Sequence, residues 1–309
     1  MCFAVPPITV EAATFDPMAI QGVRHTLSDH PLLQLPALVD LARRLAPRGA
    51  VRYHQGRVTP DADFTRAPEQ HPINRPPAEI IENIESASAW FSLHDIQIDP
   101  VYRQLVFDVL ESVRPMVEAS DPGMHFRAGW IFVSSPGAIT PYHMDHEHNF
   151  ILQLRGRKRI HVFPALDPRI VSEASLERFH GEGSRELVRY DPAFEASARV
   201  FDAGPGDGAF MPTTAPHWVE NGAEVSVTAS FTWFSEGTRR RRALYQLKHA
   251  MRTRGLWTPE VGHRPFLDGV AARTYQRYLA ARKTAATLRD TPFHDLDVPF
   301  ATNPPGSAY

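Results

Sequence analysis

The stretch that decides the fold is T-P-Y-H-M-D-H-E-H, which runs from Thr140 to His148. Residues i and i+2 of a β-strand point to the same face of a sheet, so His143 and Asp145 can direct an imidazole and a carboxylate to one point. A third ligand must come from a distant segment, and His217 follows a later predicted strand. Two histidines and one carboxylate on one face suit Fe(II) and leave coordination positions open.

The same stretch holds further candidate ligands. On a regular strand His146 and His148 point away from His143, so we expect them to lie behind the site or at the surface. Glu147 shares the face of Asp145 and is a weaker candidate. Histidine-rich clusters can also bind two zinc ions in metallo-hydrolases. Here, however, the order is H-x-D-H-x-H, whereas the metallo-β-lactamase superfamily has H-x-H-x-D-H.

On both sides of this stretch the pattern is one of short strands separated by turns. Arg155-Gly156-Arg157 is a tight turn between two of them, and Gly204–Gly208 is a sharp turn that leads into 209–212. The chain has 28 prolines among 309 residues, which favours a fold with many turns. The predicted strands are 128–134, 150–154, 158–163 and 225–234.

Helices are predicted on either side of the strand region. Asp99 followed by Pro100 is a strong helix start, with Asp99 as the N-cap. The segment 165–200 is expected to be a long polar excursion that could form part of an entrance through Arg178, His180, Arg185 and Arg189. The other predicted helices are 36–46, 238–254 and 266–289, the last followed by an irregular tail.

These patterns predict three parts of one mainly β protein. Residues 1–120 form a mixed α/β segment that completes and flanks a barrel, residues 121–236 form the catalytic core, and residues 237–309 form a helical region with a tail. We expect the core to be an antiparallel barrel with α-helices at its sides, because such a barrel can bring the strand before His217 next to the strand of His143.

Composition limits the classes of partner. Lys plus Arg is 33 and Asp plus Glu is 35, and this balance, a formal net charge of −2, gives no general attraction to nucleic acid or anionic membrane. The Arg239–Arg242 run opens a predicted helix, so we interpret it as a solvated or partner-facing surface. No apolar run is long enough to span a bilayer. The single cysteine, Cys2, and the lack of a recognisable signal peptide predict a cytoplasmic location.

Taken together, several motifs resemble those of the JmjC-type oxygenases. The likeness is to the cupin-like branch that includes the asparaginyl hydroxylase acting on hypoxia-inducible factor, and it spans about residues 125–235. That family has T-P-x-H-x-D, an asparagine six residues after the first ligand, Q-x-x-G-x-K, a P-G-D turn and a last histidine. Here these are Thr140–Asp145, Asn149, Gln153–Lys158, Pro205–Asp207 and His217.

The resemblance implies that the core is a double-stranded β-helix, the cupin or jelly-roll fold. It also implies a metal centre of His143, Asp145 and His217 that holds Fe(II), with 2-oxoglutarate as cosubstrate. A compact lysine ammonium after a tight turn can hold the far carboxylate of this dianion, and Lys158 occupies that position. The other cosubstrate residues that the resemblance implies are Thr140, Asn149 and Ser230.

Two positions depart from the family pattern. Ser230 stands where the family often has an asparagine. The segment Ser86–Leu93 has Trp90 and Phe91 but no tyrosine, although the family brings a tyrosine hydroxyl to the far carboxylate from there.

The resulting expectation is a dioxygenase that uses O₂ and 2-oxoglutarate, releases succinate, and hydroxylates a C–H bond of a protein or peptide side chain or of a small molecule. N-demethylation is the same chemistry on an N-methyl group. The alternatives are a cupin-like binding or regulatory protein without turnover, and a cupin metalloenzyme that does not use 2-oxoglutarate. The resemblance also suggests a homodimer formed through the C-terminal helices.

Overall fold

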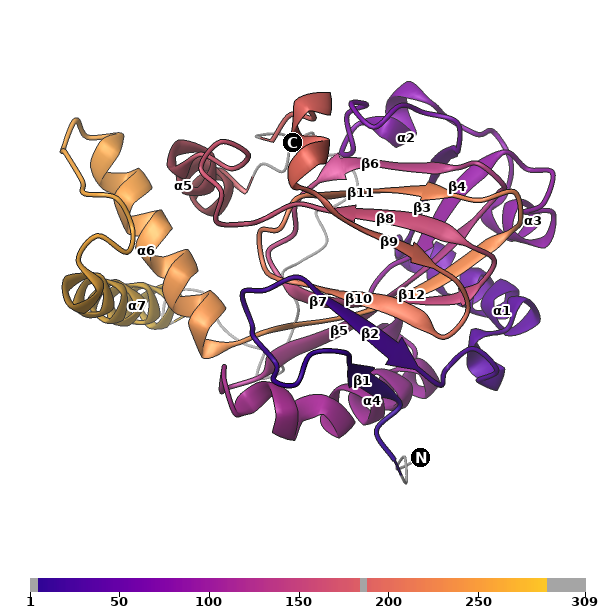
Figure 1. Cartoon of the computed structure of the whole chain (residues 1–309), viewed down its shortest axis with the longest axis horizontal. Helices are drawn as coiled ribbons and strands as arrows, with labels where there is room; N and C mark the ends of the chain where they lie inside the picture. Colours follow the sequence, from indigo (N-terminus) through magenta and orange to yellow (C-terminus); the bar gives the residue numbers. More distant parts are fainter. Residues whose placement is uncertain (1–4, 184–187, 288–309) are drawn as a thin grey trace.

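The structure is a computed structural model that describes residues 5–183 and 188–287 of the chain. Two antiparallel sheets, of eight and four strands, face each other across a common interior (Figure 1). This arrangement, with helices at its sides, confirms the predicted mainly β, double-stranded β-helix class. Cys2, Arg185 and the predicted tail after residue 289 lie outside the described residues.

The larger sheet has eight antiparallel strands. They are β1 (Ile8–Val10), β2 (Gln21–His25), β3 (Val51–Gln55), β4 (Ala89–Leu93), β5 (His125–Ser134), β7 (His148–Arg155), β10 (Asp207–Met211) and β12 (Ser226–Phe234). Their spatial order is β1-β2-β10-β7-β12-β5-β4-β3. Side chains alternate along β12, so that Phe231 and Trp233 join the outer apolar core whereas Thr228 and Ser230 face the other sheet.

The smaller sheet completes the barrel. Its strands are β6 (Ile139–His143), β8 (Lys158–Val162), β9 (Arg199–Ala203) and β11 (His217–Asn221), in the order β6-β11-β8-β9. Apolar side chains from both sheets, among them Ile151, Ala209 and Val219, form one buried cluster between them. The predicted strands are confirmed to within one residue: 128–134 lies in β5 and 150–154 in β7, whereas 158–163 and 225–234 each extend one residue beyond β8 and β12.

Helices cover the outer face of the larger sheet (Figure 1). They are α1 (Leu35–Leu45), α3 (Pro77–Glu82) and α4 (Pro100–Glu118), and a short α2 (Ala67–Gln70) lies near β3. As predicted, α4 begins after Asp99, whose carboxylate accepts hydrogen bonds from the backbone N–H groups of Val101 and Tyr102. The apolar stripe of α4 packs on β5 and β12 in one continuous core with α1.

The segment 165–200 contains more structure than the predicted polar excursion. A helix, α5 (Glu173–Glu182), begins at Ser172, whose side chain accepts from the backbone N–H of Ser175. The buried Phe179 of α5 belongs to an apolar cluster with Tyr142 and Met144 on the outer side of the smaller sheet. This packing stabilises a helix whose own sequence is only weakly amphipathic.

Two further helices, α6 (Glu236–Arg252) and α7 (Pro265–Thr287), form the C-terminal region and lie at one side of the barrel (Figure 1). Both agree with the predicted helices within a few residues. Ion pairs fix α6 to α5, since Lys248 contacts Glu173 at 2.5 Å and Arg252 contacts Glu177 at 2.7 Å. Within the described ranges, no helix is long and apolar enough to cross a membrane.

Candidate metal centre

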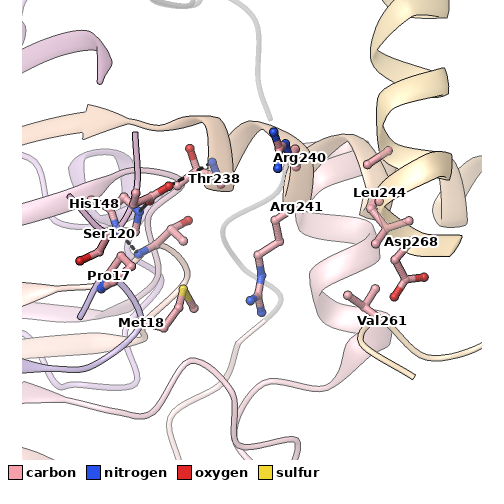
Figure 2. A pocket seen from close by; sticks show the side chains of 15 residues that line it. Pro17, Met18, Ser120, His148, Thr238, Arg240, Arg241, Leu244, Val261 and Asp268 are labelled. Carbon is pink, nitrogen blue, oxygen red and sulfur yellow. Dashed lines mark hydrogen bonds and ion pairs between the residues drawn. The ribbon is translucent and has the colours of Figure 1, made fainter. Parts of the chain in front are cut away.

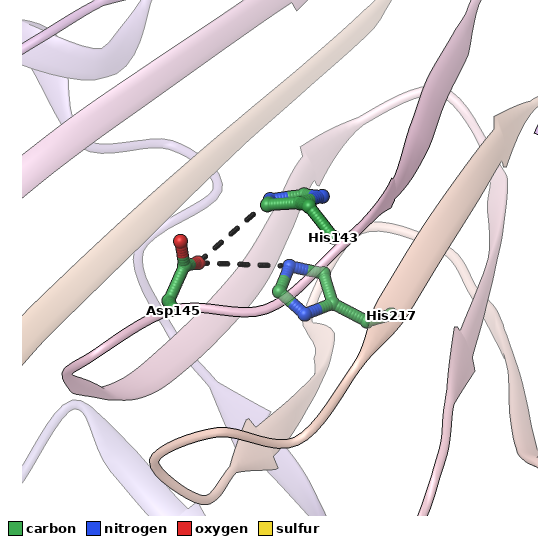
Figure 3. Close-up of side chains that lie close together, drawn as sticks. All are labelled: His143, Asp145 and His217. Atoms are coloured by element: carbon green, nitrogen blue, oxygen red, sulfur yellow. Dashed lines mark ion pairs between the residues drawn. The ribbon is translucent and has the colours of Figure 1, made fainter. Parts of the chain in front are cut away.

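Three side chains from two distant segments of the sequence converge at one end of the barrel (Figure 3). β6 ends at His143 and β11 begins at His217, and these two histidines are cross-strand partners in the smaller sheet. The Oδ2 atom of Asp145 lies 3.8 Å from Nε2 of His143 and 3.7 Å from Nε2 of His217. The candidate ligand atoms of the three residues all lie within 4.8 Å of one another.

The other ring nitrogen of each histidine is held by the backbone. Nδ1 of His143 donates to the carbonyl of Pro141 at 2.8 Å, and Nδ1 of His217 donates to the carbonyl of Ala215 at 3.1 Å. A carbonyl accepts but cannot donate, so these bonds put the proton on Nδ1 and leave a lone pair on Nε2. This is the arrangement by which proteins orient metal-binding histidines.

The donor set fits a divalent metal ion with open positions. Ligand atoms at about 2.1 Å from one octahedral ion lie about 3.0 Å apart, so the distances of 3.8 Å and 3.7 Å from Asp145 to the two histidines would have to close by less than an ångström. Both histidines are almost fully buried, and Asp145 is partly exposed. Two neutral imidazoles and one carboxylate on one face leave the remaining positions of such an ion to small molecules.

The route by which Asp145 reaches this point differs from the prediction. His143 and Asp145 were expected on one strand face, but β6 ends at His143 and Asp145 lies in the connection that follows. A register shift between His217 and Val219 makes Val219 the partner of Thr140. Thr140 and His143, three residues apart, therefore face the interior together, as a β-bulge allows.

The hydroxyl oxygen of Thr140 accepts a hydrogen bond of 2.8 Å from Nε1 of Trp90 on β4. Trp90 belongs to the segment Ser86–Leu93, which contains no tyrosine. Its indole instead orients the Thr140 hydroxyl, whose own proton stays available for an acceptor in the barrel interior.

Asn149 and Ser230 lie together on neighbouring strands of the larger sheet. The side-chain nitrogen of Asn149 donates to the hydroxyl oxygen of Ser230 at 3.2 Å. The amide oxygen of Asn149 is buried without a hydrogen-bond partner in the described part of the chain. Such an atom normally has a partner, so a hydrogen-bond donor at this place would satisfy it.

Lys158 is the most unusual charged group of the interior. It shares the inner face of β8 with Ile160 and Val162, and only 5% of its surface is exposed. Burial lowers the pKa of its ammonium to about 7. Within the ranges 5–183 and 188–287, the ammonium of Lys158 has no hydrogen bond or ion pair. A buried cation without an anion is costly, which makes this a place for a bound anion.

The turn before Lys158 has a fixed geometry. Gly156 has a φ of +69°, and a Cβ added there would lie 2.4 Å from the carbonyl oxygen of Val225. The buried Gln153 closes the same turn by donating to the carbonyl of Gly156 and to the hydroxyl of Ser226. These contacts explain the Q-x-x-G-x-K pattern, because Gln153 and Gly156 fix the turn that places Lys158.

The neighbouring acid and histidines lie outside the convergent group, which contains only His143, Asp145 and His217 among the described residues. His146 stacks on Phe179, with ring centroids 3.8 Å apart. His148 contacts Asp121 instead, and Glu147 is not part of the group.

A contact that the sequence did not indicate is the ring of Phe64 on a candidate ligand. Phe64 stacks on His143 with 3.8 Å between ring centroids and an interplanar angle of 2°. The guanidinium of Arg52 covers the other side of Phe64 at 4.5 Å. Phe64 stands in a polar, proline-rich loop, which gave no periodic signal that could have placed it at the site.

A cavity of about 430 Å³ opens beside these residues. The loop Pro60–Thr65, Tyr142 and the segment Val188–Tyr190 line it. The hydroxyl of Tyr142 is buried and has no hydrogen-bond partner in the described structure. The N-terminal region and the 165–200 segment thus meet next to His143.

Known proteins of related sequence match part of the chain. The rat HSPB1-associated protein 1 is 29% identical over 115 residues, which cover 35% of this chain and 24% of that protein. The zebrafish lysine-specific demethylase 8 is 28% identical over 102 residues, covering 31% of this chain and 25% of that one. The chain therefore matches about a quarter of the length of these relatives.

Among solved structures, the ribosomal oxygenase YcfD of Escherichia coli is 18% identical, with 71% of this chain and 44% of that chain covered and a TM-score of 0.34. The oxalate decarboxylase of Lactobacillus farciminis is 18% identical, with 35% and 24% covered and a TM-score of 0.24. Neither superposition carries further weight. A family model described as the cupin-like domain matches residues 55–239, more than half of the chain. The chain belongs to this cupin-like family, in agreement with its resemblance to the JmjC-type oxygenases.

Proposed function

We propose that the protein is an Fe(II)- and 2-oxoglutarate-dependent oxygenase that hydroxylates a C–H bond. The observation that carries this proposal is the combination of the triad at one end of the barrel with the buried, unpartnered ammonium of Lys158 on its inner wall. The triad alone fits many metal enzymes, and Lys158 adds the requirement for an anion that reaches into the barrel.

In this proposal Nε2 of His143, a carboxylate oxygen of Asp145 and Nε2 of His217 hold Fe(II). With O₂ and 2-oxoglutarate, such an iron centre supplies the oxidising power for hydroxylation while 2-oxoglutarate is decarboxylated to succinate. The chain orients the ligands through the carbonyls of Pro141 and Ala215. Phe64 covers the ring of His143 and limits the access of water to it.

The distance from the triad to Lys158 suits 2-oxoglutarate. Val162 is the cross-strand partner of His217, and Lys158 lies four residues before it on the same face of β8. Four residues of a strand span about 13 Å. A five-carbon dicarboxylate and the length of a lysine side chain fill that gap together, so that one carboxylate lies near the triad and the other at the ammonium.

Three more polar groups would complete the cosubstrate site. The hydroxyl of Thr140, oriented by Trp90, can donate to the far carboxylate. Asn149 and Ser230 lie together on the opposite wall and can hydrogen-bond to the end of the molecule nearer the metal. We propose these roles for the four residues Thr140, Asn149, Lys158 and Ser230.

The substrate is proposed as a protein or peptide side chain or a small molecule. One relative in the comparisons is named a lysine-specific demethylase, which favours a protein substrate. The cavity of about 430 Å³ next to Phe64 and Tyr142 is the proposed route by which a substrate group approaches the metal. A cytoplasmic location, proposed from the single cysteine, suits either kind of substrate.

An anaerobic titration tests the proposal. Fe(II) followed by 2-oxoglutarate should give a weak visible charge-transfer band, which His143→Ala abolishes and Lys158→Met loses at low 2-oxoglutarate. Arg159→Met is the matched control, because Arg159 is the next cation on β8 but is exposed and paired with Glu220. It should keep the band.

The outcomes separate the alternatives. Failure of the wild-type protein to bind iron and 2-oxoglutarate would refute the proposal. Binding without any succinate after O₂ is admitted would favour a non-catalytic binding protein. Metal-dependent activity that survives Lys158→Met would favour a cupin metalloenzyme that does not use 2-oxoglutarate.

A further inference from the structure

The turn that joins β10 to β11, residues 212–216, contacts two of the three candidate ligands. The backbone N–H of Thr214 donates to the carbonyl of Asp145 at 2.8 Å, and the carbonyl of Ala215 accepts from Nδ1 of His217. Thr214 is fully buried and has a φ of +60°, a conformation that a β-branched residue adopts only when its surroundings enforce it.

His148 holds this turn from outside the barrel interior. Its Nδ1 accepts a hydrogen bond of 3.2 Å from the backbone N–H of Thr213, and its Nε2 lies 3.2 Å from Oδ2 of Asp121. Because Nδ1 accepts, the proton resides on Nε2 and is donated to Asp121. The hydroxyl of Thr213 in turn donates to the carbonyl of His146 at 2.7 Å. The turn and the Asp145–His148 segment are therefore linked on both sides.

Asp121 connects the 212–216 turn and the Asp145–His148 segment to the helices α4 and α6. It follows the end of α4, and its Oδ1 accepts from the backbone N–H of Gly237 in the first turn of α6 at 3.2 Å. Burial opposes ionisation of Asp121, but hydrogen bonds from His148 and Ser235 lower its pKa overall. The bond to His148 is thus a charge-assisted one, stronger than a neutral hydrogen bond.

We propose that His148 is a positioning residue for the metal centre. The pair of His148 and Asp121 clamps the 212–216 turn, and the turn sets where Asp145 and His217 place their ligand atoms. Asp145 lies beyond the end of β6, so the sheet does not fix its backbone, and the bond from Thr214 takes over that task. This inference rests on the proposed metal binding of the triad.

His148 can be replaced with a defined change of contacts. It lies with Ser120 and Thr238 in the wall of a cavity of about 310 Å³ between the barrel and α6 (Figure 2), so a smaller side chain creates no clash. His148→Ala removes the acceptor for Thr213. His148→Asn places its amide oxygen near the position of Nδ1 and can keep that acceptor while losing the contact to Asp121.

The experiment is a Co(II) titration of the metal-free, full-length protein, followed by visible absorption, with circular dichroism as a check of folding. His148→Ala should weaken Co(II) affinity by about tenfold or more, the range seen when groups that support metal ligands are removed. His148→Asn should recover most of that loss. Both variants should lose thermal stability, so a loss of stability alone does not distinguish a positioning role from a structural one.

Glu177→Ala is the matched control. It breaks the ion pair of the buried Glu177 with Arg252 between α5 and α6. The hydrogen bonds of the Glu177 side chain go to Arg252 and not to the 212–216 turn, so the change should lower stability without changing Co(II) affinity. Wild-type affinity in His148→Ala, or an equal loss in Glu177→Ala, would overturn the positioning role. A wild-type protein that binds no Co(II) would instead refute the proposed metal site, and this inference with it.

Discussion

Lys158 carries its ammonium on the inner wall of the barrel, where burial lowers its pKa to about 7. An unfolded lysine has a pKa of about 10.4. Folding therefore releases a proton between about pH 7 and pH 10. The buried charge destabilises the folded protein fully below about pH 7, and this destabilisation disappears as the pH rises to about 10. A carboxylate bound beside Lys158 would remove this cost and raise the pKa again.

Replacing the lysine should accordingly stabilise the ligand-free protein. We expect Lys158→Met to raise the free energy of unfolding by about 1–3 kcal/mol at pH 7, since it removes an uncompensated buried charge but keeps the volume. The gain should shrink toward pH 10, where wild-type Lys158 is neutral. Urea unfolding at both pH values measures this. A Lys158→Met protein that is less stable at pH 7 would show that the ammonium already has a partner.

The same group should make cosubstrate binding depend on pH. At saturating Mn(II), we expect the affinity of the wild-type protein for 2-oxoglutarate to be constant below about pH 7. Above it, binding must take up a proton, so affinity should fall by up to about tenfold per pH unit. Calorimetry between pH 6 and 8.5 checks this, with Lys158→Met as the weak, pH-independent reference. A flat wild-type profile would contradict the assignment.

Among the elements, the β7–β8 hairpin sets the position of Lys158 through its turn at Gly156. Gly156 and Gly49 both have a φ of +69°, but a Cβ at Gly49 meets no atom within 4 Å whereas one at Gly156 meets a carbonyl oxygen at 2.4 Å. Gly49→Ala should cost about 1–2 kcal/mol from backbone strain alone. Gly156→Ala should cost more and should also weaken 2-oxoglutarate binding.

Thermal unfolding and a 2-oxoglutarate titration of the two glycine variants make the comparison. Equal stability losses with unchanged cosubstrate affinity would show that the turn does not place Lys158.

The elements also show which features the sequence could predict. The start of α4 was predictable because Asp99 and Pro100 act within one turn of the chain. The helix α5 was missed because it depends on packing of Phe179 against the smaller sheet, a contact between distant segments. Its local signals, Ser172 at the start and Gly183 at the end, stood inside a polar stretch.

Some features of the candidate site could likewise be predicted from the sequence, whereas others could not. Short motifs predicted which residues converge, although the regular strand on which His143 and Asp145 were to share a face ends at His143. The position of Asp145 beyond β6, the Trp90 contact to Thr140 and the Phe64 stack depend on register and on a loop that folds back. No short pattern in one sequence encodes these contacts.

At the scale of the whole molecule, the division into 1–120, 121–236 and 237–309 stays a prediction, and the C-terminal helices present an exposed apolar surface. We define the α7 surface as Phe266, Leu267, Val270 and Tyr278, of which Phe266 is 78% exposed. Exposed apolar groups of this size in one region are typical of an interface. We propose that this surface forms a homodimer.

Phe266→Asp with Leu267→Asp should convert a dimer to a monomer, because the charges oppose burial of the α7 surface. Light scattering after size exclusion gives the mass, and Val101→Asp, at an exposed apolar residue of α4, is the control that should stay dimeric. A wild-type protein that is monomeric at micromolar concentration would rule out the proposed dimer.

The most direct test of the account is a crystal structure with Mn(II) and the cosubstrate analogue N-oxalylglycine. We expect Mn(II) to be bound by Nε2 of His143, a carboxylate oxygen of Asp145 and Nε2 of His217, with the far carboxylate of the analogue on the ammonium of Lys158. A metal ion held by other residues, or an analogue whose far carboxylate lies away from Lys158, would contradict it.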